Sequence, residues 1–296
     1  MKYREDDLKR WIKPPSDTEE EKLENSKRMV EDAIGADEKL KYMPIEVFAQ
    51  GSYANDTNVR LDSDIDINVM YKGFFLYDLP KNTTKEQFEI KDSAVDYTFR
   101  DFKSDVENAL ANKFGRNNVK RKDKCLNIIG NTYRVQTDVV PTFEYKRFYL
   151  NNTYCSGTVF YPDSNLNSRI INFPKQHITN GKEKNKSTQR LFKRLTRLHK
   201  KLRYKMIEEK ARVNNNITSF LLESLVYNIP ENTINNCESW VELLAESIVF
   251  IHNKDKEKWL EVSELLYLFH DGRKWSINDV VDYMKQLWKY LELGDG

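Results

Sequence analysis

The segment Asp64–Val69, with the sequence Asp-Ile-Asp-Ile-Asn-Val, constrains the fold of this chain most. Acidic or amide residues alternate strictly with branched apolar ones. Because successive side chains of a β-strand point to opposite faces, the pattern predicts a strand with one apolar and one acidic face. Asp64 and Asp66 then lie about 7 Å apart at their Cα atoms, at about 3.3 Å rise per residue. An edge strand with a solvated acidic face is the alternative.

Three carboxylates and a Gly-Ser pair together predict phosphate chemistry. Two carboxylates on one rigid strand repel each other unless a cation lies between them, and oxygen ligands suit Mg²⁺ or Mn²⁺. Asp138 is a lone acid in an apolar strand-like segment, and we expect it on a neighbouring strand. Gly51 and Ser52 follow a predicted strand, where the backbone can approach a phosphate closely. The set predicts a two-metal site, with one ion activating a hydroxyl and the other steadying a triphosphate.

The secondary-structure signals divide the chain near residue 185. The first part is predicted as mixed α/β, with a Ser16 capping box ahead of a helix over 17–34. It has predicted strands over 44–49, 64–71, 125–129 and 132–141 and a loop over 73–84. The helical spacing over 86–110 predicts either one helix or an interrupted one. Gly130-Asn131 predicts a two-residue hairpin turn between the last two strands. The second part is predicted as all-helical, with a long basic amphipathic helix over 182–212 and helices over 217–227, 238–252, 256–269 and 276–291.

Composition excludes several classes of protein. The formal net charge is only +2, so any nucleic-acid-binding patch must be local. The three cysteines are far apart and form no Cys/His cluster, which argues against a zinc site or a disulfide framework and fits a reducing cytosol. There is no run of about 18 apolar residues and no signal-peptide pattern at the N-terminus. We therefore expect a cytoplasmic protein without a membrane partner.

The spacing of these motifs carries a family resemblance. A Gly-Ser pair, a short gap, an apolar-flanked Asp-x-Asp and a later lone Asp resemble the nucleotidyltransferase superfamily of the polymerase-β type. The Gln50–Tyr53 loop, the long basic helix and the segment over 217–230 are similar to the bacterial cGAS/DncV-like nucleotidyltransferases (CD-NTases). The resemblance implies an α/β (α+β) fold: a mixed, mostly antiparallel sheet over 1–185, a helical lobe over 186–296, and an active site in the cleft between them.

The resemblance also implies a role for each candidate residue. Asp64 and Asp66 would hold two Mg²⁺ ions, and Asp138 the one that activates the attacking ribose hydroxyl. The implied nucleotide-binding residues are Gln50, Gly51, Ser52, Lys200, Ser219 and Phe220, with Lys193 as the second choice for the lysine that meets the triphosphate. From the residues alone, Lys200 could equally be solvated surface, Ser219 a helix cap and Phe220 part of a core.

The implied function is a Mg²⁺-dependent synthesis of cyclic di- or trinucleotide signals from NTPs, with release of pyrophosphate. The biological role would be bacterial anti-phage (CBASS-type) signalling, in which the product activates a separate effector protein. A nucleic-acid activator is not implied, because the zinc-binding insertion of the animal enzyme is absent. One alternative is an enzyme that extends RNA 3′ ends or makes linear 2′–5′ oligoadenylate. A second is a non-catalytic nucleotide-binding module.

Overall fold

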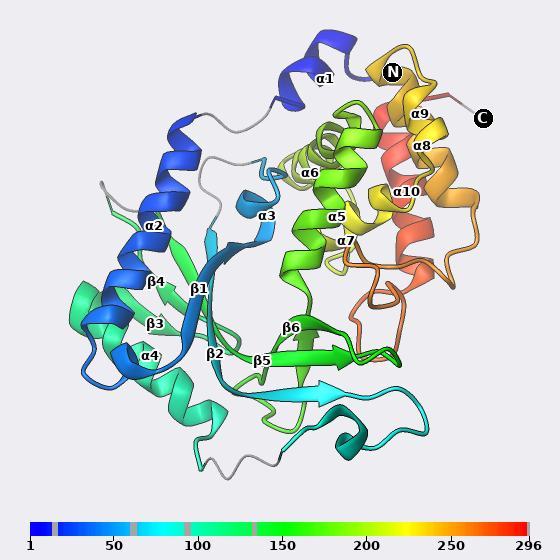
Figure 1. Ribbon diagram of the computed structural model, residues 1–296. Helices are drawn as coiled ribbons and strands as arrows, with labels where there is room; N and C mark the ends of the chain where they lie inside the picture. The colour runs from blue at the N-terminus through cyan, green and yellow to red at the C-terminus, as the bar shows by residue number, and fades with distance from the viewer. Residues whose placement is uncertain (14–16, 60–63, 92–95, 132–134, 295–296) are drawn as a thin grey trace. The chain divides into compact units, whose positions relative to one another are not determined.

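The computed structural model describes residues 1–13, 17–59, 64–91, 96–131 and 135–294. Their contacts define two compact units (Figure 1). The sheet unit comprises Ser16–Ala54 and Arg60–Pro174, and the helical unit comprises Met1–Pro15, Asn55–Val59 and Lys175–Gly296. This division differs from the predicted boundary at residue 185, which falls inside helix α5 (Pro174–Ser187). The N-terminal segment joins the helical unit because Leu8 and Ile12 are buried in its core.

One mixed sheet forms the centre of the sheet unit. Within the described residues it has seven strands in the order β1-β2-β5-β4-β3, with β6 beside β5 and β7 beside β6. Its strands are β1 (Ile45–Gln50), β2 (Ile65–Asp78), β3 (Val119–Arg121), β4 (Leu126–Ile128), β5 (Thr137–Phe148), β6 (Tyr154–Phe160) and β7 (Ile170–Asn172). β2 and β5 are parallel, and the other pairs described are antiparallel. The predicted mixed, mostly antiparallel sheet is confirmed.

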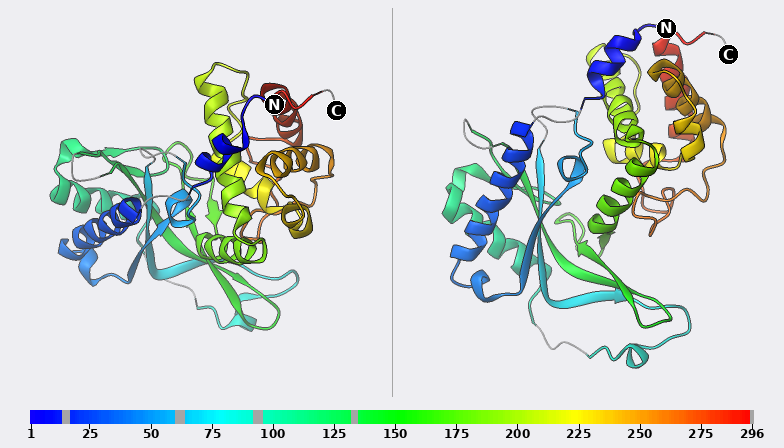
Figure 2. Two further views of the ribbon diagram at one scale, coloured as in Figure 1. Left: turned by 90° about the horizontal axis from the view of Figure 1, so that it is seen from above. Right: turned by 45° about the horizontal axis from the view of Figure 1, so that its top comes forward.

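Two helices cover one face of this sheet. α2 (Asp17–Ala36) and α4 (Phe99–Phe114) contact each other and the strands, and Figure 2 shows them side by side. Ile65, Ile67 and Val69 are fully buried, as the alternating pattern predicts. The unit also contains the short helices η1 (Leu40–Tyr42), α3 (Gly51–Ala54), η2 (Lys85–Phe88) and η3 (Arg116–Asn118). The apolar face of β2 thus packs into the core, and its acidic side chains lie on the opposite face of the sheet.

Two strand predictions were wrong in their limits. β2 does not end before Gly73 but continues to Asp78, because β5 is long enough to pair with it that far. The register shifts between Tyr71 and Phe75, so Gly73 marks an irregularity inside a strand rather than a loop. The predicted two-residue turn at Gly130-Asn131 was also wrong, because Asn131 itself forms a β-bridge. Among the described residues the last β4–β5 pair is Ile128–Thr137, and the predicted strand start at 132 lies outside them.

Two helix predictions were wrong as well, and a third is confirmed in its interrupted form. The helical spacing over 86–110 corresponds to two separate helices, η2 and α4. The long basic helix is two helices, α5 and α6 (Leu191–Glu208), separated where Gln189 and Arg190 adopt positive φ. The segment over 256–269 is not helical: the chain reverses at Glu264, also at positive φ, and Leu260 forms a β-bridge with Tyr267. The predicted cap Ser16 lies outside the described residues.

The helical unit packs around the apolar stripe of α6. Its other helices are α1 (Glu5–Trp11), α7 (Ser219–Tyr227), α8 (Glu231–Asn235), α9 (Trp240–Asn253) and α10 (Ile277–Leu291). Leu195, Leu198, Leu202 and Met206 are buried in the core, which confirms the predicted stripe. Among the described residues, no helix combines the length and apolarity that a bilayer span requires.

Candidate active site

Four strands place polar side chains in one row across the sheet. Asp66 of β2 is in register with Gln50 of β1 on one side and with Asp138 of β5 on the other. Asp138 is in turn in register with Asn127 of β4. Residues opposite one another on neighbouring strands share a face of the sheet. The adjacent row, on the other face, is apolar and consists of Ala49, Ile67, Val139 and Leu126. The register therefore brings the predicted carboxylates together on the face away from the core.

Asp138 is fixed by two side chains that sequence reasoning missed. Asn127 Nδ2 donates to Asp138 Oδ1 at 2.6 Å, and Lys122 Nζ donates to the same oxygen at 3.2 Å. Asn127 could have been noticed as an amide between two apolar strand residues. Lys122 gave no signal, because it precedes β4 in a polar link. Both contacts are to Oδ1, and the Cys125 thiol also donates a hydrogen bond to the Asp138 carboxylate.

Gln50 takes part in a relay one step further along the sheet. Asn68 Nδ2 donates to Gln50 Oε1 at 3.2 Å, and Thr142 Oγ1 donates to Asn68 Oδ1 at 2.8 Å. Asn68 and Thr142 are buried, so the relay sets the orientation of the Gln50 amide beside Asp66. Its predicted contact with a nucleotide stays a prediction.

Gly51 lies directly against Asp66. It begins the one-turn helix α3 with a φ of 72°, and a Cβ at this position would be 2.0 Å from Asp66 Oδ2. Ser52 follows in the same turn and is half-buried. The predicted loop after β1 is thus a tight helical turn whose first residue needs both a left-handed backbone and the absence of a side chain.

The electrostatics of the row favour a bound cation. Burial, together with the nearby charges of Asp138 and Asp64, raises the pKa of Asp66 to about 7, although Lys122 opposes the shift. Two carboxylates held at adjacent positions in this way accept a divalent ion readily. The residues therefore fit Mg²⁺ in their chemistry.

The same residues do not form a closed ligand cage. In the described part of the chain, no three His, Cys, Asp or Glu side chains gather as a metal site. Mg²⁺ is commonly held by one or two protein carboxylates together with substrate phosphates and water. The carboxylates of Asp66 and Asp138, with Asp64 directly before the strand, supply only part of a ligand set. Such a set suits an ion that binds together with a nucleotide.

We expect the metal-free protein to show the raised pKa of Asp66 as a pH-dependent stability. The pKa in the folded state is about 7 and the ordinary value is 3.8. The folded state holds the proton more tightly, so the contribution to stability is fully present below about pH 3.8 and lost as the pH rises towards 7. In EDTA, Asp66→Asn should match the wild type in thermal midpoint near pH 4 and exceed it increasingly up to pH 8. A difference that does not change with pH would contradict this.

The helical unit holds Lys200 away from solvent. Its side chain is 2% exposed, and its ammonium donates to Glu223 Oε2 at 2.7 Å and to Thr57 Oγ1 at 2.9 Å. An ammonium engaged in this way is not free for a triphosphate, so the geometry does not favour the predicted contact. Lys193 is also buried, but its ammonium is more loosely paired, 3.9 Å from Asp56 Oδ2. Lys193 is therefore the better candidate of the two.

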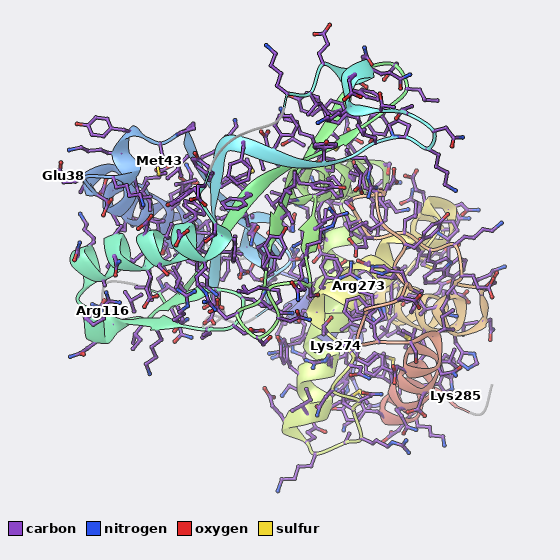
Figure 3. The ribbon with its side chains drawn as sticks, turned by 90° about the horizontal axis from the view of Figure 1, so that it is seen from below. Glu38, Met43, Arg116, Arg273, Lys274 and Lys285 are labelled. Carbon is purple, nitrogen blue, oxygen red and sulfur yellow. The ribbon has the colours of Figure 1, made fainter. Side chains whose placement is uncertain are left out.

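Ser219 and Phe220 open helix α7. Thr218 is the N-cap, since its hydroxyl accepts from the Leu221 N–H, and Ser219 is thus the first helical residue rather than the cap. Phe220 is half-buried, with its ring centroid 5.8 Å from that of His177 and 6.1 Å from that of Trp275. The guanidinium of Arg273, labelled in Figure 3, lies 5.9 Å from the Phe220 ring. The ring is therefore partly accessible and flanked by aromatic and cationic groups.

Comparison with known proteins assigns this arrangement to a family. Residues 179–292 match the model of the cGAS/DncV-like nucleotidyltransferase C-terminal helical domain. A protein of Cecembia lonarensis named cyclic dipyrimidine nucleotide synthase CdnE is 55% identical, over 98% of this chain and 99% of that protein. The chain belongs to the cGAS/DncV-like nucleotidyltransferases. The predicted resemblance is confirmed, and with it the enzyme class of a nucleotidyltransferase.

Solved structures of CD-NTases confirm the fold. The CdnE cyclic dinucleotide synthase of Elizabethkingia meningoseptica, with GTP and Apcpp, has a TM-score of 0.81 at 34% identity and covers 98% of this chain and 99% of its own. The CdnE c-UMP-AMP synthase of Rhodothermus marinus, with Apcpp and Upnpp, has a TM-score of 0.84 at 30% identity and covers 99% of each chain. These similarities extend over both units of this CD-NTase.

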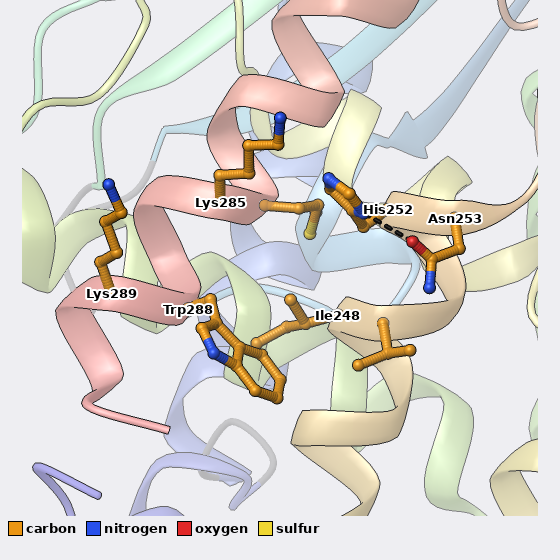
Figure 4. A pocket seen from close by; sticks show the side chains of 8 residues that line it. Ile248, His252, Asn253, Lys285, Trp288 and Lys289 are labelled. Carbon is orange, nitrogen blue, oxygen red and sulfur yellow. Dashed lines mark hydrogen bonds between the residues drawn. The ribbon is translucent and has the colours of Figure 1, made fainter. Parts of the chain in front are cut away.

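A cavity of about 390 Å³ lies elsewhere, between α9 and α10 of the helical unit (Figure 4). It is lined by Ile248, Val249, His252, Asn253, Met284, Lys285, Trp288 and Lys289. None of the predicted site residues is among them. The candidate site of this CD-NTase is therefore argued from the polar row of the sheet and not from this cavity.

Proposed function

We propose that this CD-NTase is a Mg²⁺-dependent synthase that joins two NTPs into a cyclic dinucleotide and releases pyrophosphate. The observation that carries the proposal is the register of Asp66 opposite Asp138 on parallel neighbouring strands. The class of product is taken from the names of the relatives. The Cecembia lonarensis protein is named a cyclic dipyrimidine nucleotide synthase and the Elizabethkingia meningoseptica protein a cyclic dipurine nucleotide synthase. Their names favour a dinucleotide over a trinucleotide.

The chemistry needs two successive phosphoryl transfers. In each, a ribose hydroxyl oxygen bonds to the α-phosphorus of an NTP, the bond to pyrophosphate breaks, and the hydroxyl proton is removed; the second transfer closes the ring. Bound Mg²⁺, or Mn²⁺ in its place, would neutralise phosphate charge and make the hydroxyl more acidic. We assign Asp64 and Asp66 to both ions. Asp138, with one oxygen held by Asn127, is assigned to the ion at the attacking hydroxyl and to the uptake of its proton.

The remaining residues would bind the donor nucleotide. Gly51 and Ser52 are assigned to the triphosphate. Gly51 has no side chain and lies against Asp66, so a phosphate near that carboxylate could approach its backbone closely. Ser219 is assigned to a phosphate and Phe220 to stacking on the base. Catalysis would then consist largely of positioning and charge neutralisation.

Pyrimidine bases are the first choice to test. The relatives of Cecembia lonarensis, 55% identical, and Legionella pneumophila, 37% identical, are both named cyclic dipyrimidine nucleotide synthase. A relative of Elizabethkingia meningoseptica at 36% identity is named cyclic dipurine nucleotide synthase, so base choice varies within the family at that level of identity. We propose a preference for UTP and CTP, and a separate effector protein of anti-phage defence as the receptor of the product.

The test is a product assay with each NTP omitted in turn. The purified chain is incubated with α-³²P-labelled NTPs and Mg²⁺ or Mn²⁺, treated with phosphatase, and its products are separated. We expect a phosphatase-resistant product that persists without ATP and GTP and disappears without pyrimidine NTPs. Linear products only, or extension of an added RNA, would replace the proposal with the RNA 3′-end or 2′–5′ oligoadenylate alternative. Binding of NTPs without formation of any product would favour the non-catalytic nucleotide-binding module.

A further inference from the structure

The loop Asn55–Val59 connects the Gly51-Ser52 turn to the strand that carries Asp66, yet its contacts lie in the helical unit. Asn55, Thr57 and Asn58 are buried, and Thr57 is fully so. A polar loop of this kind normally lies on the surface, because its backbone and side chains need hydrogen-bond partners. Its burial therefore points to partners that hold it in place.

Three buried groups close a cluster on this loop. Thr57 Oγ1 donates to Glu223 Oε2 at 2.9 Å, and Lys200 Nζ donates to both of them, at 2.9 Å and 2.7 Å. Each of the three residues is at most 4% exposed. α6 supplies the lysine, α7 the glutamate and the loop the hydroxyl, so the cluster joins three separate segments of chain at one point.

The other carboxylate oxygen of Glu223 contacts His177, which lies beside Phe220, the ring proposed to stack on a base. His177 Nε2 lies 3.0 Å from Glu223 Oε1, and the His177 ring packs beside that of Phe220. Burial opposes ionisation, but the Lys200 charge and the His177 hydrogen bond outweigh it and hold the pKa of Glu223 well below its usual range. Glu223 is therefore a fixed carboxylate that orients Thr57 on one side and His177 on the other.

A second anchor acts on the neighbouring residue of the loop. Arg197 Nη1 donates to the Asp56 carbonyl at 2.6 Å, while its Nε and Nη2 donate to the Ile12 carbonyl at 3.0 and 2.8 Å. Burying a lysine and an arginine is costly, and apolar residues would often give equal stability. Two buried charged side chains, Lys200 and Arg197, donate hydrogen bonds to this one short loop. This use of buried charge indicates that the position of the loop matters to the protein.

We propose that Glu223 and Lys200 are positioning residues that clamp the loop Asn55–Val59 through Thr57, and thereby set the turn and the strand on either side of it for catalysis. Neither residue touches the reacting atoms. Lys200 is assigned to this clamp and not to the triphosphate. The inference rests on the proposed function, because a positioning role requires a reaction to be positioned.

Two isosteric substitutions in the helical unit make a matched test. Thr57→Val removes the clamped hydroxyl but keeps the shape and the Lys200–Glu223 pair. Thr196→Val is its control, because Thr196 is equally buried and its hydroxyl has no hydrogen-bond partner among the described residues. Thr57→Ser restores the hydroxyl. Hydrogen–deuterium exchange of the full-length, nucleotide-free protein reports the loop directly, and kcat and KM for NTPs report its effect on the reaction.

We expect amide exchange over 55–59 to become about tenfold faster in Thr57→Val. We expect kcat to fall about tenfold at nearly unchanged KM, since misplacement lowers the rate more than binding. Thr196→Val and Thr57→Ser should resemble the wild type. Unchanged loop exchange would overturn the clamp, and faster exchange at unchanged kcat would overturn the positioning role. If the wild type makes no cyclic product, the proposed function fails and the exchange measurement still decides the clamp.

Discussion

Replacing Asp66 by Asn is expected to slow cyclic-dinucleotide formation by about 10³-fold or more. The carboxylate lies opposite Asp138, and burial together with the charges of Asp138 and Asp64 raises its pKa to about 7. Loss of a metal-held charge removes several kcal/mol of transition-state stabilisation, and about 1.4 kcal/mol corresponds to a tenfold change in rate. Initial rates of phosphatase-resistant product, measured over a Mg²⁺ titration, check the prediction.

Asp138→Asn should be equally severe, and the double variant hardly worse, because residues that act as one unit are not additive. Glu46→Gln is the matched control. It removes a carboxylate from β1 of the same sheet, where Glu46 forms a partly exposed ion pair with Lys72 at 3.3 Å, a contact worth at most about 1 kcal/mol. Wild-type rates in Asp66→Asn, or an equal loss in Glu46→Gln, would remove the polar row from the mechanism.

Asp66→Asn has opposite expected effects on activity and on stability. The variant should be inactive, yet without metal at pH 8 it should be more stable than the wild type, because the raised pKa of Asp66 makes the ionised carboxylate costly there. Misfolding would instead lower both quantities. The two measurements together separate a site residue from a structural one.

The polar row of the sheet unit could be predicted in part because its signal is local. The alternation over 64–69 follows from the period of two in a strand, and the apolar neighbours of Asp138 indicate another strand. What the sequence did not contain was the register. Only the pairing of β2 with β5 places Asp66 opposite Asp138, and only that of β4 with β5 brings Asn127 to the same point.

The contacts of Lys200 in the helical unit could not be predicted for a different reason. The basic character of α6 offered many lysines, and nothing local distinguishes a solvated lysine from one buried against a carboxylate far along the chain. Lys200 finds Glu223 and Thr57, at sequence separations of 23 and 143 residues. Helix limits also failed where the backbone takes positive φ at non-glycine residues, as at Arg190 and Glu264. Such conformations are uncommon for these residue types and leave no sequence signal.

Gly51→Ala is expected to lower activity by about 10²-fold and stability by about 1–3 kcal/mol. The backbone at Gly51 has a φ of 72°, where an alanine costs about 1–2 kcal/mol. The new Cβ would also lie 2.0 Å from Asp66 Oδ2, 2.9 Å from its Cγ and 3.1 Å from its Cβ. Rotating the carboxylate end alone cannot relieve all three contacts, so either the Gly51 turn or Asp66 as a whole must shift. Displacement of a catalytic group by about 1 Å can cost about 10² in rate.

Two comparisons separate the backbone strain at Gly51 from its collision with Asp66. Gly181→Ala in α5 is the control, because its Cβ would meet only Phe192 and Val262 at 3.8 and 3.9 Å, and alanine in a helix adds about 0.5–1 kcal/mol of stability. In an Asp66→Ala background the contacts with Oδ2 and Cγ disappear, and only the backbone strain and the 3.1 Å contact with the Cβ of residue 66 remain. Gly51→Ala should therefore destabilise that variant less than the wild type. Equal destabilisation in both backgrounds would show that Gly51 is required for its backbone alone. A smaller effect in the Asp66→Ala background would show that this glycine is present because the Asp66 carboxylate occupies the space of its side chain.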